Sequence, residues 1–87
     1  MQTFFPALLM PDEEDGGFGV VVLGTGVLGQ GETAVDALRD AGESLQELVW
    51  SSVDLGEPVP RPADPSEEDR ARGQIALLQI TLPAVAA

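Results

Sequence analysis

The chain has 87 residues, with 15 aspartates and glutamates against four arginines, no lysine and a net charge of −11. So acidic a chain lacks the basic face that phosphate backbones require, which excludes direct binding of nucleic acid and disfavours anionic membranes. Without cysteine or a long apolar run, disulfides, thiolate metal sites and membrane spans are also excluded, and the cytoplasm is the expected compartment.

The first third of the sequence predicts three strands. Residues 3–10 are apolar and partly aromatic, and Pro6, which has no N–H to donate to a neighbouring strand, indicates an edge strand or a strand start. Residues 12–17 (Asp-Glu-Glu-Asp-Gly-Gly) predict an exposed turn, because clustered charges resist burial and glycines allow positive φ. The β-branched run in residues 18–23 predicts a strand buried on both faces, and residues 27–30 a shorter third strand.

A long helix is predicted from Thr33 to residue 54 or 55. The Thr33 hydroxyl is placed to accept a hydrogen bond from the backbone near Asp36, as a helix N-cap does. Gly56 suits the left-handed residue that follows a helix, and Pro58 cannot continue one. One helix face is apolar or small and is expected to pack on the sheet: Ala34, Leu38, Ala41, Leu45, Leu48 and Ser52, widened by Ala37, Val49 and Val53.

The remaining sequence predicts an acidic, proline-rich connection over residues 58–73, a strand over residues 75–82 and a tail over residues 83–87. The composition of the connection predicts a stiff, partly extended surface segment. In the last strand the mixed side is expected to meet solvent or a second subunit, and the uniformly apolar side consists of Ala76, Leu78, Ile80 and Leu82. Together the elements predict a single α/β (α+β) domain over residues 1–87, β-β-β-α-β, with the helix packed on one face of a small sheet.

The sequence lacks most residue types that carry catalysis. Histidine, cysteine, lysine and tyrosine are absent, so the serines have no base to activate them and no enzyme activity is expected. The acidic turn at residues 12–15 lacks the ligand spacing of a calcium loop, so no metal site is expected.

A glycine motif raises the alternative of dinucleotide binding. Residues 24–29 read Gly-Thr-Gly-Val-Leu-Gly and follow a valine-rich strand, as in dinucleotide-binding proteins. In those proteins the helix begins within the glycine turn, so that its N–H groups face the pyrophosphate. Here residues 30–33 come first, and Glu47, at the distance expected of the ribose-binding acid, lies inside the predicted helix. No cofactor is expected, and a dinucleotide-binding fragment stays the second alternative.

Two groups of acidic side chains are candidates for binding a partner. One group is the turn and the other is a stripe on the predicted outer face of the helix: Asp12, Glu13, Glu14, Asp15, Asp36, Asp40, Glu43 and Glu47. Aligned like charges weaken a helix, and a basic partner relieves this penalty, although many such stripes only face solvent. Trp50 is expected to anchor the helix in the core, or otherwise to anchor an interface.

Several segments resemble, in order and spacing, the HicB-type antitoxin family. The resemblance covers about residues 4–62 and rests on Phe5-Pro6-Ala7-Leu8, the turn closing in Gly16-Gly17-Phe18, Gln30-Gly31-Glu32-Thr33 opening a helix with Ala37, and Gly56-Glu57-Pro58-Val59-Pro60. Where the family usually has Pro-Asp-Leu-Pro-Gly, residues 22–26 read Val-Leu-Gly-Thr-Gly. The resemblance implies a reduced ribonuclease-H-like domain, without hydrolytic activity, that binds a small basic HicA-type toxin and blocks this mRNA-cleaving ribonuclease. It does not imply promoter binding, for which relatives use a C-terminal extension.

The expected function is therefore steric and electrostatic masking of such a toxin. Hydrophobic residues make up 44% of a chain too short to bury them all, so a homo-oligomer is also expected. The first alternative is an orphan homo-oligomeric HicB-like domain that has no toxin partner.

Overall fold

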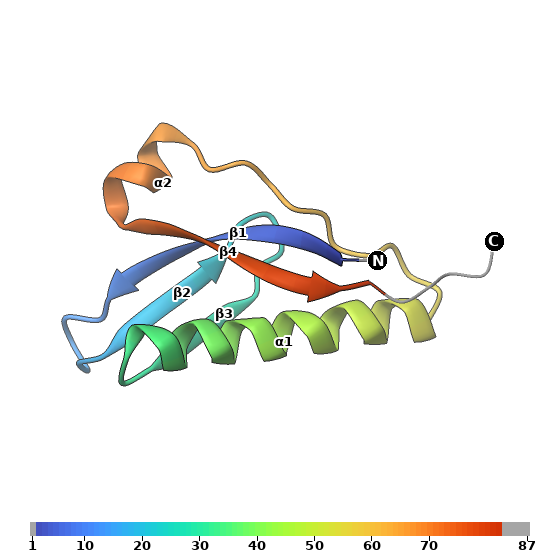
Figure 1. Ribbon diagram of the computed structural model, residues 1–87, viewed down its shortest axis with the longest axis horizontal. Helices are drawn as coiled ribbons and strands as arrows, with labels where there is room; N and C mark the ends of the chain where they lie inside the picture. The colour runs from blue at the N-terminus through green and yellow to red at the C-terminus, as the bar shows by residue number, and fades with distance from the viewer. Residues whose placement is uncertain (1, 83–87) are drawn as a thin grey trace.

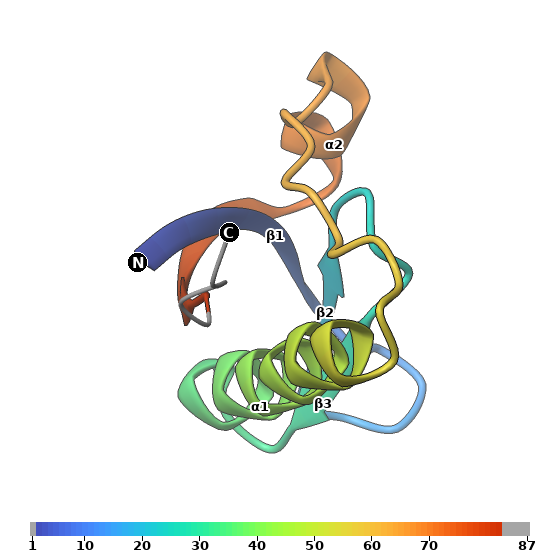
Figure 2. The same ribbon diagram turned by 90° about the vertical axis from the view of Figure 1, so that its right-hand side faces the viewer.

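The computed structural model describes residues 2–82, which form a four-stranded antiparallel sheet of order β3-β2-β1-β4 with a helix on each side. Figure 1 shows the long helix along one face of the sheet, and Figure 2 shows the short helix on the opposite side. The predicted fold class is confirmed, and the predicted tail at residues 83–87 lies outside the described residues. The elements are β1 (Gln2–Pro11), β2 (Phe18–Val22), β3 (Leu28–Gly31), α1 (Ala34–Asp54), α2 (Glu67–Arg72) and β4 (Gln74–Thr81).

β1 is a central strand, so the predicted edge position of residues 3–10 is wrong. It pairs with β2 through residues 7–11 and with β4 through residues 2–9. The carbonyl of Pro6 accepts a hydrogen bond from the N–H of Leu23 (3.1 Å), just past the end of β2. The N–H and the carbonyl of one strand residue point to the same side of the strand. The N–H that Pro6 lacks would therefore point toward Leu23, past the end of β2, and not toward β4. A proline is therefore tolerated in a central strand whose neighbour has just ended.

The ends of α1 are those that the sequence predicts. Thr33 is the N-cap, and its hydroxyl accepts a hydrogen bond from the backbone N–H of Asp36 (3.1 Å). At the other end the N–H of Leu55 donates to the carbonyl of Ser51 (3.0 Å), and Gly56 has a φ of 69°. Local chemistry at each end thus fixes the length of the helix.

The buried face of α1 is rotated from the predicted one, because Leu48 is only half-buried and Ala37 and Val49 are fully buried. Its buried residues are Ala37, Ala41, Leu45, Val49 and Ser52. The strand residues that complete the core cluster are Phe5, Ala7, Leu9, Val20, Val22 and Ile80. Val21 is only half-buried, so β2 is fully buried on one face and not on both. The buried Ser52 hydroxyl donates to the carbonyl of Leu48 (2.8 Å), which satisfies it inside the core.

Two glycines of β3 allow α1 to lie very close to the sheet. A Cβ added to Gly29 would lie 2.6 Å from both the Cβ and the backbone nitrogen of Ala41. A Cβ added to Gly31 would lie 2.6 Å from the backbone nitrogen of Ala37. Real Cβ atoms do not approach their neighbours so closely, so this contact requires glycine on the strand, and alanine is the largest residue that fits opposite it.

α2 is an addition to the predicted fold, because the sequence indicated only an irregular connection over residues 58–73. Ser66 and Asp69 form a capping box: the Ser66 hydroxyl accepts from the Asp69 N–H (3.0 Å), and the Asp69 carboxylate accepts from the Ser66 N–H (2.9 Å). The backbone hydrogen bond from Ser66, and then its side chain, hold the pKa of the Asp69 carboxyl below its ordinary value. The Ser-x-x-Asp pattern was the sequence signal for this helix.

The two faces of the sheet are covered to different extents. One face packs against α1, and the other, called the open face below, carries large apolar side chains that remain exposed. Phe4 is 53% exposed, Leu28 66% and Leu77 64%. The strand register places all three on this face, since Leu77 lies opposite Pro6 and Leu28 opposite Val21. The expectation that this side of the last strand is not part of the core is confirmed at Leu77.

We predict that Gly29→Ala lowers the free energy of unfolding by about 1–3 kcal/mol, the usual cost of overpacking, because the added methyl meets the backbone of α1. The matched control is Gly19→Ala in β2, where the nearest atom would lie 4.0 Å from the added Cβ. Neither glycine has a positive φ, so the comparison isolates the effect of space. Urea denaturation of both variants measures the difference, and equal losses would contradict this account of the packing.

Candidate functional site

The structure brings the acidic turn and the first part of the helix stripe to one end of the molecule. The turn over residues 12–15 connects β1 to β2 and lies at the end where α1 begins (Figure 1). Asp12 and Asp40 border the same surface hollow, and Asp15 and Glu32 border a neighbouring one that also includes Asp12. The turn and the first half of the helix stripe therefore form one acidic region.

Asp12 stabilises the acidic turn through hydrogen bonds to its backbone. Its carboxylate accepts hydrogen bonds from the backbone N–H groups of Glu14 (3.1 Å) and Asp15 (3.2 Å). Its own N–H donates to the carbonyl of Gly17 (2.9 Å), which closes the loop. Glu13, Glu14 and Asp15 are exposed on the turn.

On α1, two of the four predicted acids have partners within the chain and two do not. The Asp40 carboxylate accepts a hydrogen bond from the backbone N–H of Gln30 (2.9 Å) and so covers part of the edge of β3. Asp36 lies 3.6 Å from Arg39 in an exposed ion pair, the one salt bridge within residues 2–82. Glu43 and Glu47 are exposed and form no hydrogen bond or ion pair in the described part of the chain. No described residue therefore neutralises their charges.

Trp50 lies on the surface with 44% of its area exposed, so the prediction that it anchors the core is wrong. Each helical residue is rotated by about 100° from the one before it. Because Val49 is in the core, the next residue points outward, and Trp50 comes one turn after Glu47 on the outer side of α1. The sequence signal for an exposed Trp50 was the stripe of small and apolar residues that is buried in the structure: Ala37, Ala41, Leu45, Val49 and Ser52.

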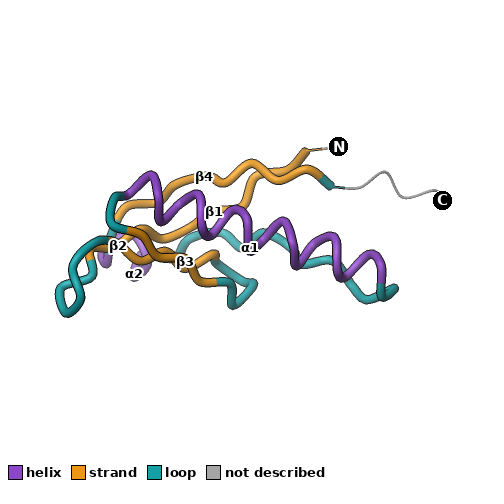
Figure 3. Tube along the Cα trace, turned by 90° about the horizontal axis from the view of Figure 1, so that it is seen from below, coloured by secondary structure: helices purple, strands orange, loops and turns teal. Residues whose placement is uncertain are grey.

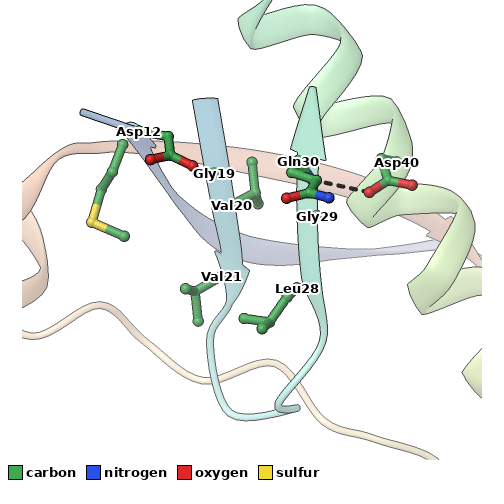
Figure 4. Close-up of a pocket in the computed structure, with 9 residues that line it drawn as sticks. Asp12, Gly19, Val20, Val21, Leu28, Gly29, Gln30 and Asp40 are labelled. Carbon is green, nitrogen blue, oxygen red and sulfur yellow. Dashed lines mark hydrogen bonds between the residues drawn. The ribbon is translucent and has the colours of Figure 1, made fainter. Parts of the chain in front are cut away.

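Beside the acids is a shallow hollow of about 430 Å³ on the β2–β3 part of the sheet. Figure 4 shows Val21 and Leu28 next to each other in this hollow, and Asp40 bonded to Gln30 at its side. Asp12 lies at another side of the hollow. A small apolar patch bordered by carboxylates is a surface suited to a protein side chain.

The glycine motif does not form a dinucleotide site. Gly24 and Gly26 have positive φ values of 80° and 77° in the turn between β2 and β3, which pair as an antiparallel hairpin. The chain therefore leaves the glycine turn as a strand, and the helix begins later, at Ala34. Because β3 separates α1 from the turn, the N-terminal N–H groups of α1 do not form part of it, and the geometry by which such proteins bind a pyrophosphate is missing. The third glycine, Gly29, instead serves the packing of α1.

Within residues 2–82, no three acidic, histidine or cysteine side chains are grouped in a way that would hold a metal ion. None of the helices there has the length and apolar character needed to cross a membrane.

Solved structures with this fold include an antitoxin domain. The N-terminal domain of the antitoxin HicB of Burkholderia pseudomallei matches with a TM-score of 0.79 and 26% identity, over 92% of this chain and 100% of that domain. The resemblance to HicB-type antitoxins is confirmed. The longer Burkholderia pseudomallei HicB antitoxin matches this HicB-like domain with a TM-score of 0.69 and 26% identity, over 94% of this chain. The chain spans 64% of the length of that antitoxin.

A third match comes from the HicA3 and HicB3 toxin–antitoxin complex. It has a TM-score of 0.63 over 93% of the HicB-like domain and 99% of that chain, and its 20% identity shows the fold alone. No family model and no curated protein matches the sequence. The similarity to the N-terminal domain of the antitoxin HicB supports a role in a toxin–antitoxin system.

We predict that Asp40→Ala lowers the free energy of unfolding by about 1 kcal/mol, because the N–H of Gln30 loses a charged acceptor at the edge of β3. Asp40→Asn, which keeps a side-chain oxygen, is expected to lose less. Glu47→Ala is the control, since Glu47 contacts no donor in the described residues. Thermal or urea unfolding of the three variants provides the measurement, and a loss at Glu47 equal to that at Asp40 would refute the assignment.

Proposed function

We propose that this chain is an antitoxin-like protein that binds and sterically masks a small basic HicA-type, mRNA-cleaving toxin. The match to the complete N-terminal domain of the antitoxin HicB is the observation that carries the proposal. The fold shared with a chain of the HicA3 and HicB3 complex supports it. The cytoplasm, where such a toxin meets mRNA, is the compartment in which the protein would act.

The outer side of α1 has the composition of a surface that binds a basic protein. Glu43 and Glu47 carry unpaired charges, and the exposed Trp50 follows within one helical turn. Tryptophan is enriched among residues that dominate binding energy, whereas surrounding charges mainly steer the partner and fix its orientation. A net charge of −11 attracts a basic partner from a distance.

Masking requires no catalytic group on the chain. A basic ribonuclease uses its positive face to hold the phosphates of RNA, so an acidic surface that occupies this face excludes the substrate by charge and by volume. The acids of the turn, Glu13, Glu14 and Asp15, extend the same negative surface beyond the start of α1. The whole region would thereby compete directly with RNA for the toxin.

The exposed apolar residues of the open face favour a second candidate, an orphan homo-oligomeric domain without a toxin. Phe4 and Leu77 are both more than half exposed, as self-association would require. Self-association is compatible with either function, so binding of a toxin is the property that separates the two.

We predict that the double variant Glu43→Gln, Glu47→Gln binds a co-expressed HicA-type toxin about tenfold more weakly at low salt, a loss of about 1.4 kcal/mol. The control is Glu67→Gln, Glu68→Gln, which removes the same charge from α2 on the opposite side of the sheet. Affinities measured by calorimetry at two salt concentrations should converge as screening increases. If no HicA-type protein is retained by the wild-type chain, the proposal fails.

A separate prediction concerns Trp50. Trp50→Ala is expected to weaken toxin binding by about 2 kcal/mol, or roughly thirtyfold, while the melting temperature stays close to that of the wild type. Leu55→Ala is the matched control, because Leu55 is also apolar, lies at the end of α1 and is 68% exposed. An equal loss of affinity for both variants would contradict a specific role for the tryptophan.

A further inference from the structure

The two edges of the sheet are protected to different extents. β3 is only four residues long, and Asp40 bonds the outward N–H of Gln30. β4 has eight residues, pairs with β1 one residue to one without a bulge, and contains neither proline nor a charged side chain. Natural proteins shield edge strands by short length, charges, prolines or bulges, because an uncovered edge pairs readily with another strand. β4 uses none of these devices.

The register shows which backbone groups of β4 face outward. The side chain of Gln46 on α1 accepts from the N–H of Thr81 (3.1 Å) and donates to its carbonyl (2.8 Å), so Thr81 points away from β1. Because backbone groups alternate between the two sides of a strand, Ile75, Leu77 and Gln79 point outward as well. Within residues 2–82, Gln46 is the side chain that hydrogen-bonds to this edge, and it reaches Thr81 alone. Three outward positions centred on Leu77 are left for another strand.

Charge indicates what kind of strand fits this edge. The chain carries a net charge of −11, yet residues 2–11 and 74–81, which form β1 and β4, contain no charged residue. Two copies of an acidic protein repel each other least where they meet through uncharged strands. A basic partner would gain nothing from charge at this edge, whereas an identical edge matches it in length, polarity and spacing.

We propose that β4 pairs antiparallel with β4 of a second copy, about a two-fold axis that passes by Leu77. In this register Leu77 lies opposite its own counterpart, and Ile75 lies opposite Gln79 of the other copy. All three outward positions then exchange hydrogen bonds with the other strand, as strand addition does in peptide recognition. The two sheets become continuous, and the exposed Leu77 side chains cover each other on the joined open face. The pairing does not depend on the proposed toxin.

The oligomeric state of the purified chain tests this pairing. Sedimentation or light scattering of the wild type should give twice the 9.1 kDa mass of one chain, and Leu77→Lys should give the single mass. Leu28→Lys is the matched control, because Leu28 is 66% exposed against 64% for Leu77, lies on the same face, and belongs to the other edge strand. It should remain dimeric. Each variant makes the net charge less negative by one, so general repulsion does not explain a difference, and circular dichroism verifies that both fold.

A cross-linking experiment locates the axis independently. The natural sequence has no cysteine, so Leu77→Cys introduces a single thiol. In the proposed register Leu77 and its counterpart form a hydrogen-bonded pair, whose Cα atoms lie about 5.5 Å apart, within the range of about 4.4–6.8 Å that a disulfide bridges. Mild oxidation should link Leu77→Cys into a dimer and leave Leu28→Cys unlinked. A wild-type chain that stays monomeric at about 1 mM, or a dimer that Leu28→Lys disrupts and Leu77→Lys does not, would overturn the proposal.

Discussion

The close contact between α1 and β3 is the constraint on which the arrangement of the surface depends. Gly29 and Gly31 leave no side chain between strand and helix, and Ala37 and Ala41 fill the space that remains. This packing fixes the rotation of α1 about its own axis. Seen from the helix side, α1 crosses the sheet at an angle (Figure 3). As a result its side chains reach both edges of the sheet, and its remaining polar residues face outward.

The structure separates charge from apolar surface within a small chain. All acidic residues lie in the turn, on or beside α1, or in the connection that contains α2, while β1 and β4 are uncharged. A charged surface attracts an oppositely charged protein over long distances and through intervening water. Strand pairing instead requires direct contact between backbone groups, and uncharged side chains favour it between two copies of an acidic chain. Because the two surfaces lie on different elements, the proposed binding of a basic protein and the proposed pairing of two copies would not compete for the same residues.

The features that could be predicted from the sequence are those set by contacts between residues close in the chain. Thr33 and Gly56 determine the helix ends through contacts within a few residues, and the resemblance to HicB-type antitoxins gave the correct order of strands and long helix. One error was local, because the Ser66–Asp69 pattern that begins α2 was missed. The other errors concern contacts between distant segments. The central position of β1 depends on β4, and the surface position of Trp50 depends on which of two overlapping stripes packs against the sheet. The structural role of Asp40 depends on Gln30 in the neighbouring strand, which no local pattern reveals.

Pro6 has a consequence for how the strands find their alignment during folding. Sliding β1 by one residue along β2 would turn its core side chains to the other face. A slide by two residues that brings Pro6 opposite Val21 would keep the faces, but one hydrogen bond of the β1–β2 ladder would be lost because proline has no N–H. The one-residue slide and this two-residue slide are therefore both penalised, and the alignment that the structure shows is favoured over them.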